Sequence, residues 1–215
     1  MKDLKQFIQS KNVCIFLCSC GVIFSTLDFV MFNILGFMRP GYNPFTQFIS
    51  ELGETGSSNA HVASIYFFIS GIFTILFALG LYIGIKKEKG SIFPPIILIL
   101  YGIFNSIGTA IFPCDPGCAG STFTGLMHLF VSFIALILMC LLPLFSWRSF
   151  KKDDNWKQYE LLTLVFGILI IVLSSIFLIF YSIDLLIGLF QRLLYYVFLL
   201  WIFLIAVKLL KIQYK

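Results

Sequence analysis

The stretch at residues 40–61, PGYNPFTQFISELGETGSSNAH, decides the fold because it is the longest polar interval between two strongly apolar segments. It carries the signals of a short helix: Asn43 can cap it, Pro44 suits its first position, and Gly53 can end it in a left-handed turn. Its apolar residues recur at i, i+3, i+4 and i+7, namely Phe45, Phe48, Ile49 and Leu52. We therefore predict an amphipathic helix over residues 44–52, lying flat in a membrane interface or over the mouth of a bundle.

The rest of the chain is far more apolar than a soluble protein. Its 215 residues are 60% hydrophobic and only 12% charged, whereas a soluble domain carries about 25% charged residues. The apolar residues come in runs of about 20, long enough to cross a bilayer core about 30 Å thick. We predict a single all-α domain over residues 1–215, a polytopic membrane bundle. Its six transmembrane helices are expected at residues 13–37, 60–85, 92–112, 123–145, 161–181 and 186–210.

The basic residues fall almost entirely on one side of these spans. Thirteen of the 15 lysines and arginines lie near the chain ends or in the loops after the second and fourth spans. Only Arg39 and Arg192 lie on the other side. Because basic loops stay in the cytoplasm, we predict a multi-pass protein of the cell membrane with both termini cytoplasmic. The net charge of +5 is then no sign of nucleic-acid binding, since the basic residues sit between spans.

Polar residues within the spans gather in the halves predicted to face outside. They include Ser25, Asp28, Ser64, Asn105, Ser106, Thr109, His128, Ser132, Ser174 and Gln191. The inner halves hold little besides Leu, Ile, Phe and Cys. Because hydrocarbon penalises polar groups, these side chains should face one another or a wet cavity. We predict a polar pocket that opens outward over an apolar floor, with the helix at 44–52 and the loop at 113–122 as its lids.

Three of the ionisable residues are candidates for catalysis: Asp28, Glu51 and His128. A carboxylate within a span, such as Asp28, is a functional candidate by default. The alternatives for it are a structural pair with Arg192 or a hydrogen bond to Asn105. His128 can serve as a general base or a metal ligand, or it can be an interfacial histidine without a role. Glu51 can equally be a solvated carboxylate.

Four further residues are candidates for binding, namely Ser50, Asn105, Asp115 and Arg192. The guanidinium of Arg192 can clamp a phosphate or carboxylate, or it can anchor its helix by reaching to the interface. A lone charge in hydrocarbon is costly, whereas a paired charge is tolerated. We therefore expect the three catalytic candidates to converge with Arg192 in one outer pocket beneath the helix at 44–52.

Two cysteines in the loop after the third span give a local signal. Cys114 and Cys118 flank an Asp-Pro-Gly turn, and an oxidising exterior permits a disulfide between them, which we predict. The alternative is a metal site that Asp115 and His128 complete. Because these mixed ligands in a short loop fit no particular metal, we assign none.

Motifs of known intramembrane hydrolases are absent from the sequence. The chain has no HExxH, no GxSxG and no pair of histidines at i, i+4. The sequence therefore names no cofactor, and it leaves open whether the protein is an enzyme.

Three separated segments resemble one family. GYNPFTQFISELGETGSSNAH, AIFPCDPGC followed by GLMH, and GLFQR before the last span are similar, in this order, to the domain-of-unknown-function family 998. The resemblance covers nearly the whole chain and implies a six-helix integral membrane protein of prokaryotic type without an assigned activity. The polar positions that match the family are Ser50, Glu51, Gly53, Asp115, His128 and Arg192. ISELG also resembles, distantly, the ISD-G segment of a eukaryotic family that includes autophagy modulators and proteins of glycosylphosphatidylinositol lipid remodelling.

Three functions compete on these observations. A protein that binds or acts on a lipid headgroup would use the carboxylates, the histidine and the arginine as acid, base and anion clamp. A non-catalytic scaffold or assembly partner would need the polar residues only to hold its helices together. A small transporter would need polar residues in the inner halves as well, and they are missing. We rank the lipid site first, with a membrane lipid as partner; a homo-oligomer stays open.

Overall fold

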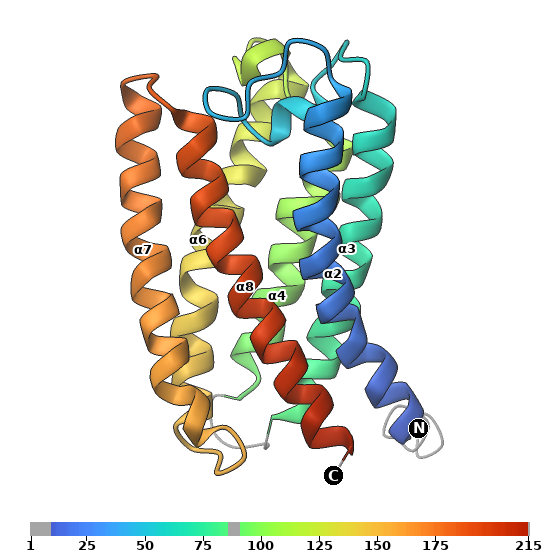
Figure 1. Ribbon diagram of the computed structural model, residues 1–215, viewed down its shortest axis with the longest axis vertical. Coiled ribbons are helices and arrows are strands. Elements are labelled where there is room, and N and C mark those ends of the chain that lie inside the picture. Colours follow the sequence, from blue (N-terminus) through green and yellow to red (C-terminus); the bar gives the residue numbers. More distant parts are fainter. Residues whose placement is uncertain (1–9, 86–90, 215) are drawn as a thin grey trace.

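Six long helices make up the fold, and each is long and apolar enough to cross a membrane (Figure 1). The computed structural model describes residues 10–85 and 91–214. The spans are α2 (Lys11–Met38), α3 (Ala60–Gly84), α4 (Phe93–Tyr101) with its continuation, α6 (Phe123–Phe150), α7 (Glu160–Ser182) and α8 (Ile187–Tyr214). The prediction of an all-α bundle of six transmembrane helices is therefore confirmed.

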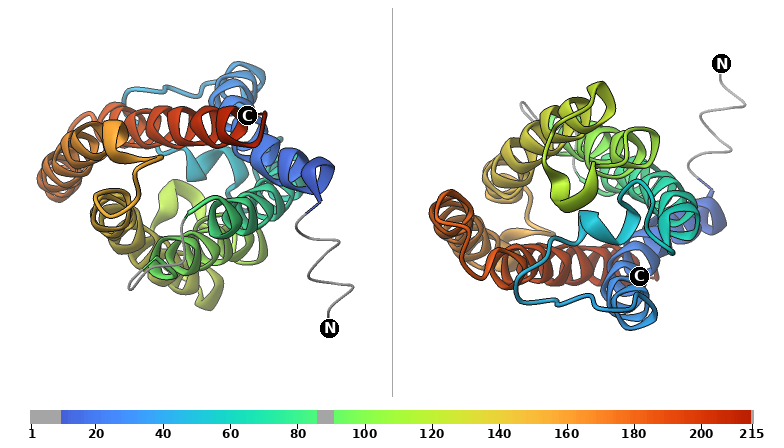
Figure 2. Two further views of the ribbon diagram at one scale, coloured as in Figure 1. Left: turned by 90° about the horizontal axis from the view of Figure 1, so that it is seen from below. Right: turned by 90° about the horizontal axis from the view of Figure 1, so that it is seen from above.

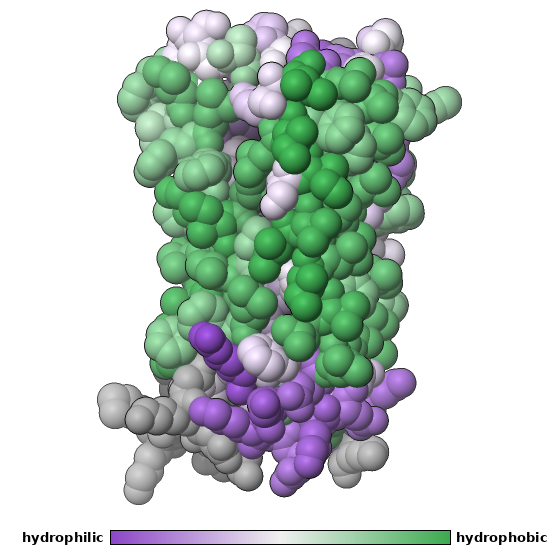
Figure 3. Space-filling model, turned by 90° about the vertical axis from the view of Figure 1, so that its left-hand side faces the viewer, coloured by the Kyte–Doolittle hydropathy of each residue, from purple (hydrophilic) through white to green (hydrophobic). Residues whose placement is uncertain are grey.

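The helices stand in a ring in the order α2, α3, α4, α6, α7, α8 (Figure 2). Each packs against the next, and α8 closes the ring by packing on α2. The C-terminus of α8 and the beginning of α2 lie at one end of the ring. We call this the basic end, because basic residues gather there. Those among the described residues are Lys11, Arg148, Lys151, Lys152, Lys157, Lys208 and Lys211. Figure 3 shows a hydrophilic region at this end, below an apolar belt. Six further lysines of the predicted basic side, at positions 2, 5, 86, 87, 89 and 215, lie outside the described residues.

The half of the ring next to the basic end is filled by large apolar side chains. Leu98, Leu142 and Phe198 are fully buried there. Trp156, from the α6–α7 connection, stacks on Phe150 with ring centroids 4.2 Å apart, and its Nε1 donates to the carbonyl oxygen of Gly84 at 3.1 Å. These side chains close the ring at this end. They occupy the place of the apolar floor that the sequence predicts.

The third span changes its helical geometry midway. α4 continues into η2, a π-helix over Gly102–Gly108, and then into α5 (Thr109–Ile111). The wider turn packs closely on α3, where a Cβ atom added to Gly71 would lie 3.1 Å from the carbonyl oxygen of Gly102. Such π-segments are frequent at functional sites. This one carries two adjacent polar residues, Asn105 and Ser106, to the interior of the ring.

The helix predicted over residues 44–52 is wrong. Residues 44–46 form a turn, and only Ser50–Gly53 is helical, as the single 3₁₀ turn η1. Gly53 does not take the left-handed conformation; that role belongs to Gly56, with φ +86°.

Side chains explain why the α-helix does not form. The N–H of Phe48 donates to Oε1 of Glu51 at 2.8 Å, and the N–H of Ile49 donates to Oε1 of Gln191 at 2.6 Å. An α-helix would need these N–H groups for its own carbonyl oxygens. Two carbonyl oxygens of the same stretch are bound by Arg192, as described below. Glu51 and partners from α8 therefore together override the helical periodicity.

Candidate functional site

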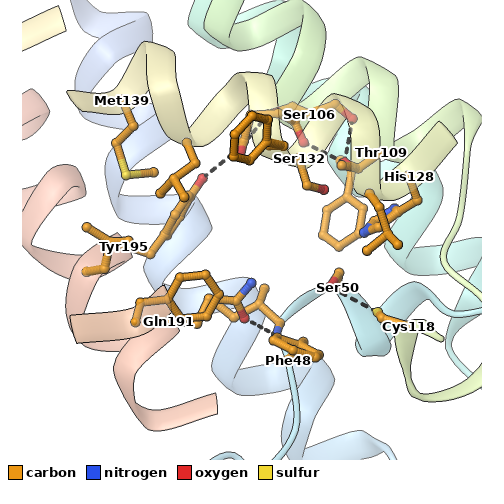
Figure 4. A pocket seen from close by; sticks show the side chains of 18 of the residues that line it. Phe48, Ser50, Ser106, Thr109, Cys118, His128, Ser132, Met139, Gln191 and Tyr195 are labelled. Atoms are coloured by element: carbon orange, nitrogen blue, oxygen red, sulfur yellow. Dashed lines mark hydrogen bonds between the residues drawn. The ribbon is translucent and has the colours of Figure 1, made fainter. Parts of the chain in front are cut away.

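A cavity of about 360 Å³ lies inside the ring, in the half away from the basic end. Figure 4 shows labelled side chains around an open space. They come from η2, α6, α8 and the α2–α3 and α5–α6 connections. Most of the lining is apolar or aromatic. Its chemically distinctive polar members are Asp28, Ser70, Asn105, Ser106, His128 and Gln191. Seven of the ten polar residues named from the sequence thus face a common space, whereas Ser25, Ser64 and Ser174 do not line it.

Asp28 on α2 is the most buried charged residue of this lining, with 1% of its surface exposed. Three hydroxyls donate to its carboxylate: those of Ser70 at 2.7 Å, Tyr195 at 2.7 Å and Tyr66. An ionised carboxylate only accepts hydrogen bonds, so three hydroxyl donors suit the charged form of Asp28. The hydroxyls therefore replace water around a buried negative charge.

The partners considered for Asp28 from the sequence are not its partners. Arg192 bonds elsewhere, and the Asn105 amide donates to the hydroxyl of Tyr195 at 3.4 Å, one step removed from the carboxylate. Among the described residues, no lysine or arginine forms an ion pair with Asp28. Its charge is solvated by hydroxyls but not neutralised.

His128 on α6 lines the same cavity and is 3% exposed. Its Nδ1 lies 2.8 Å from the carbonyl oxygen of Phe112. A carbonyl oxygen can only accept, so Nδ1 carries the hydrogen, an assignment made from this bond. In the neutral ring Nε2 then holds a lone pair, which can accept a hydrogen bond or a proton. Of the predicted catalytic residues, Asp28 and His128 thus share the cavity.

Glu51, the third predicted catalytic residue, does not line the cavity. Its carboxylate accepts from the N–H of Phe48 and, at 2.7 Å, from Nε2 of Gln47. Its carbonyl oxygen accepts from Arg39, whose guanidinium also pairs with Glu54. Glu51 therefore shapes the connection between α2 and α3, residues 39–59, which we call the α2–α3 segment.

Arg192 on α8 lies outside the lining as well. It is 8% exposed, and Nη1 donates to the carbonyl oxygens of Pro44 at 2.7 Å, Gln47 at 2.9 Å and Gly188 at 3.1 Å. Nη2 donates to the hydroxyl of Tyr42. The guanidinium anchors the α2–α3 segment to α8, and these contacts engage it in place of a ligand anion.

The two remaining binding candidates have different surroundings. Asp115 accepts from Oγ1 of Thr122 at 2.7 Å and from the N–H of Thr122 at 2.8 Å, which hold the pKa of its carboxyl below the ordinary value. It thereby supports the start of α6, where Thr122 caps the helix by accepting from the N–H of Gly125 at 3.1 Å. Ser50 does line the cavity, with its Oγ 3.3 Å from Sγ of Cys118.

Cys114 and Cys118 form a disulfide in the structure, with Cα atoms 4.9 Å apart. Both sulfur atoms and a ring nitrogen of His128 lie within 4.8 Å of one another. Soft thiolates and an imidazole are ligands of zinc and copper, so the reduced pair could hold such an ion with His128. The disulfide withholds the thiolates that this would require.

Loss of this disulfide is expected to lower the free energy of unfolding by about 2 kcal/mol, the amount associated with closing a very short loop. Thermal unfolding of detergent-solubilised protein, with and without reductant, measures the effect. The variant Cys114→Ser should unfold at the temperature of the reduced protein and should not respond to reductant. Free thiols at both positions in protein prepared without reductant would contradict the bond.

The hydroxyl donors to Asp28 are not among the residues predicted from the sequence. Tyr66 and Ser70 stand at i, i+4 on α3, so they share one face of that helix, and Tyr195 lies one turn beyond Gln191 on α8. All three occupy the same half of their spans as Asp28. Their common depth was the signal that could have identified them.

Comparison with known proteins agrees with the architecture. A family model described as "Protein of unknown function (DUF998)" matches residues 22–208, which reach from within α2 to within α8 and include the four spans between them. No curated protein and no solved structure matches the chain. Since the family match covers nearly the whole chain, as the resemblance predicts, the chain belongs to the DUF998 family of multi-pass membrane proteins of unknown function.

Proposed function

We propose that the protein binds a lipid-like amphiphile whose polar head occupies the cavity. The observation that carries this proposal is the lining itself. A carboxylate and an imidazole, Asp28 and His128, face the same space as Phe32, Phe133 and Phe177. Sites for small molecules are concave and mostly apolar, with a few polar groups that orient the ligand.

The wall toward α7 supports access from the membrane. Phe133, Leu178 and Tyr181 line the cavity, yet 58%, 44% and 48% of their surfaces are exposed. A single layer of side chains therefore separates the cavity from the surrounding lipid on this side. Figure 3 looks onto the α7 side and shows an apolar surface with a recess near its upper end. An acyl chain can lie against this surface while its head reaches inward.

The packing favours binding over transport. A transported solute would need a polar route through the basic half as well. There the ring is filled by buried side chains such as Leu142, Phe198 and Trp201. One polar contact of this half, from Nε1 of Trp201 to Oγ1 of Thr163 at 3.4 Å, joins two neighbouring helices rather than lining a path.

We infer that the basic end faces the cytoplasm and the cavity faces the outside of the cell membrane, because lysines and arginines gather at one end. Reporter enzymes fused after Gly120 and after Asp154 test this topology. A reporter that works only outside the cytoplasm should be active after Gly120 and inactive after Asp154. Equal activity at the two sites would refute the topology.

Filling the cavity tests the binding function. The variant Ser132→Trp places a large ring in the lining, whereas Ile137→Trp, on the same helix at a position 44% exposed, points outward. Native mass spectrometry of protein extracted in mild detergent counts tightly bound lipid. We expect wild type and Ile137→Trp to retain it, and Ser132→Trp to lose about nine tenths of it, equivalent to about 1.4 kcal/mol. Wild-type protein without bound lipid would overturn the proposal.

A further inference from the structure

The charge of the cavity lining is unbalanced. Asp28 is 1% exposed, and its three contacts come from neutral hydroxyls, so no cation balances its ionised form. A buried charge without a counter-ion is costly, even when hydrogen bonds solvate it. Asp28, which carries this energetic cost, lies at the cavity rather than in the tightly packed half of the ring.

The nearby positive charges are committed elsewhere. Arg192 is bound to backbone oxygens of the α2–α3 segment, and Arg39 pairs with Glu54. Among the residues that line the cavity, none is lysine or arginine, and the only basic side chain is His128. Its Nδ1 hydrogen points to Phe112, so its neutral ring offers the cavity an acceptor rather than a donor. The lining therefore combines a carboxylate with neutral polar groups and holds no lysine or arginine.

Aromatic rings surround the same carboxylate. Phe32 follows Asp28 by one helical turn on α2, and its ring centroid lies 5.5 Å from that of Tyr195 and 5.9 Å from that of Phe67. All four residues line the cavity. The faces of aromatic rings attract cations, and the attraction is strongest where water is excluded.

We propose that the ligand carries an ammonium group that pairs with Asp28 among these rings. The inference rests on the proposed function, because it names the headgroup of the amphiphile that the cavity binds. An ammonium supplies the missing positive charge and, when it bears N–H groups, donors for the carboxylate. Anionic headgroups are disfavoured, because Asp28 would repel them and no lysine or arginine of the lining would compensate.

Three amphiphiles with one chain length and different heads test this inference: dodecylammonium, dodecanol and dodecanoate. Each is added at the same mole fraction to protein in an uncharged maltoside micelle, and native mass spectrometry measures its binding. We expect dodecylammonium to bind at least about tenfold more tightly than dodecanol, since a hydrogen-bonded charge pair is worth about 1.5–3 kcal/mol. Dodecanoate should bind least.

The variant Asp28→Asn is the matched comparison, because it keeps the shape of the side chain and removes its charge. It should bind dodecylammonium and dodecanol equally, while Ile137→Trp, which alters a 44% exposed position outside the cavity lining, should retain the preference. Each amphiphile partitions into the micelle to the same extent whichever variant is present. This partitioning therefore cancels when the variants are compared. If Asp28→Asn does not fold, the preference measured on the wild type alone decides.

The outcomes separate this inference from the proposed function. Equal binding of dodecylammonium and dodecanol to the wild type overturns the ammonium and leaves the amphiphile site intact, whereas no binding of any of the three overturns both. Competition then identifies the source of the ammonium. Displacement of dodecylammonium by phosphatidylethanolamine alone supports a lipid headgroup, and displacement by ethylammonium as well supports a free amine. Displacement by neither overturns the inference.

Discussion

Replacing Arg192 by methionine is expected to lower the free energy of unfolding by about 3 kcal/mol or more. The guanidinium is the donor to the carbonyl oxygens of Pro44, Gln47 and Gly188 and to the hydroxyl of Tyr42. Methionine has a similar length and no donor, so these buried acceptors would lose a charged partner, at about 1.5–3 kcal/mol for a bond of this kind. Thermal unfolding in detergent measures the loss.

Arg192→Lys separates charge from geometry. A lysine keeps the positive charge but lacks the planar fork that reaches several acceptors at once, so we expect an intermediate stability. A fully stable Arg192→Met protein would show that the anchor is dispensable. If that protein had also lost its ligand, Arg192 would be assigned to binding an anionic group, as considered from the sequence, rather than to anchoring the α2–α3 segment.

Gly188→Ala is expected to destabilise the same contact from the opposite side. A Cβ atom at Gly188 would lie 2.2 Å from the carbonyl oxygen of Gln47 and 2.6 Å from that of Pro44, and backbone atoms cannot yield as a flexible side chain can. Overpacking of this kind costs about 1–3 kcal/mol, which exceeds the gain of about 1 kcal/mol in helix propensity.

Gly167→Ala on α7 is the control for this change. Its added Cβ would meet only side-chain carbons, Cδ2 of Leu144 at 3.3 Å and Cβ of Pro143 at 3.4 Å. We expect it to leave the unfolding temperature within a few degrees of wild type or to raise it. Equal unfolding temperatures for the two variants would mean that the α2–α3 segment is not held firmly against α8.

The spans could be predicted from the sequence because a single physical requirement determines them. A helix that crosses hydrocarbon needs about 20 apolar residues, and this requirement is local. The observed helices differ mainly at their ends. α6 and α8 run beyond the predicted residues 145 and 210, to Phe150 and Tyr214. Basic residues lie in these extensions, and their long side chains can reach water while the helix continues.

The α2–α3 segment could not be predicted in the same way. Its apolar periodicity is that of a helix, but the bonds that decide its conformation come from Gln191 and Arg192, more than 140 positions later in the chain. A local pattern contains no information on such partners. The error at Gly53 has the same origin, since the expected left-handed turn follows only if the helix forms.

The candidate site was predicted in part, for a related reason. The concentration of polar residues in one half of the spans was enough to predict that Asp28 and His128 face one cavity. The predicted partner of Asp28 was wrong. We expected an opposite charge, Arg192, whereas three hydroxyls solvate Asp28. Tyrosine and serine are common in spans, so their role emerges only when three helices are placed side by side.

The anchor between Tyr42 and Arg192 joins the first connection of the chain to its last helix. During synthesis the first connection leaves the ribosome long before α8 does, since chains are made from the N-terminus. Until α8 is inserted, the carbonyl oxygens of Pro44 and Gln47 lack the donor that satisfies them in the finished protein. The connection between α2 and α3 is therefore held over the cavity only after α8 has been inserted. A chain that ends before α8 would keep this backbone exposed, and quality-control proteases could distinguish it from the complete protein.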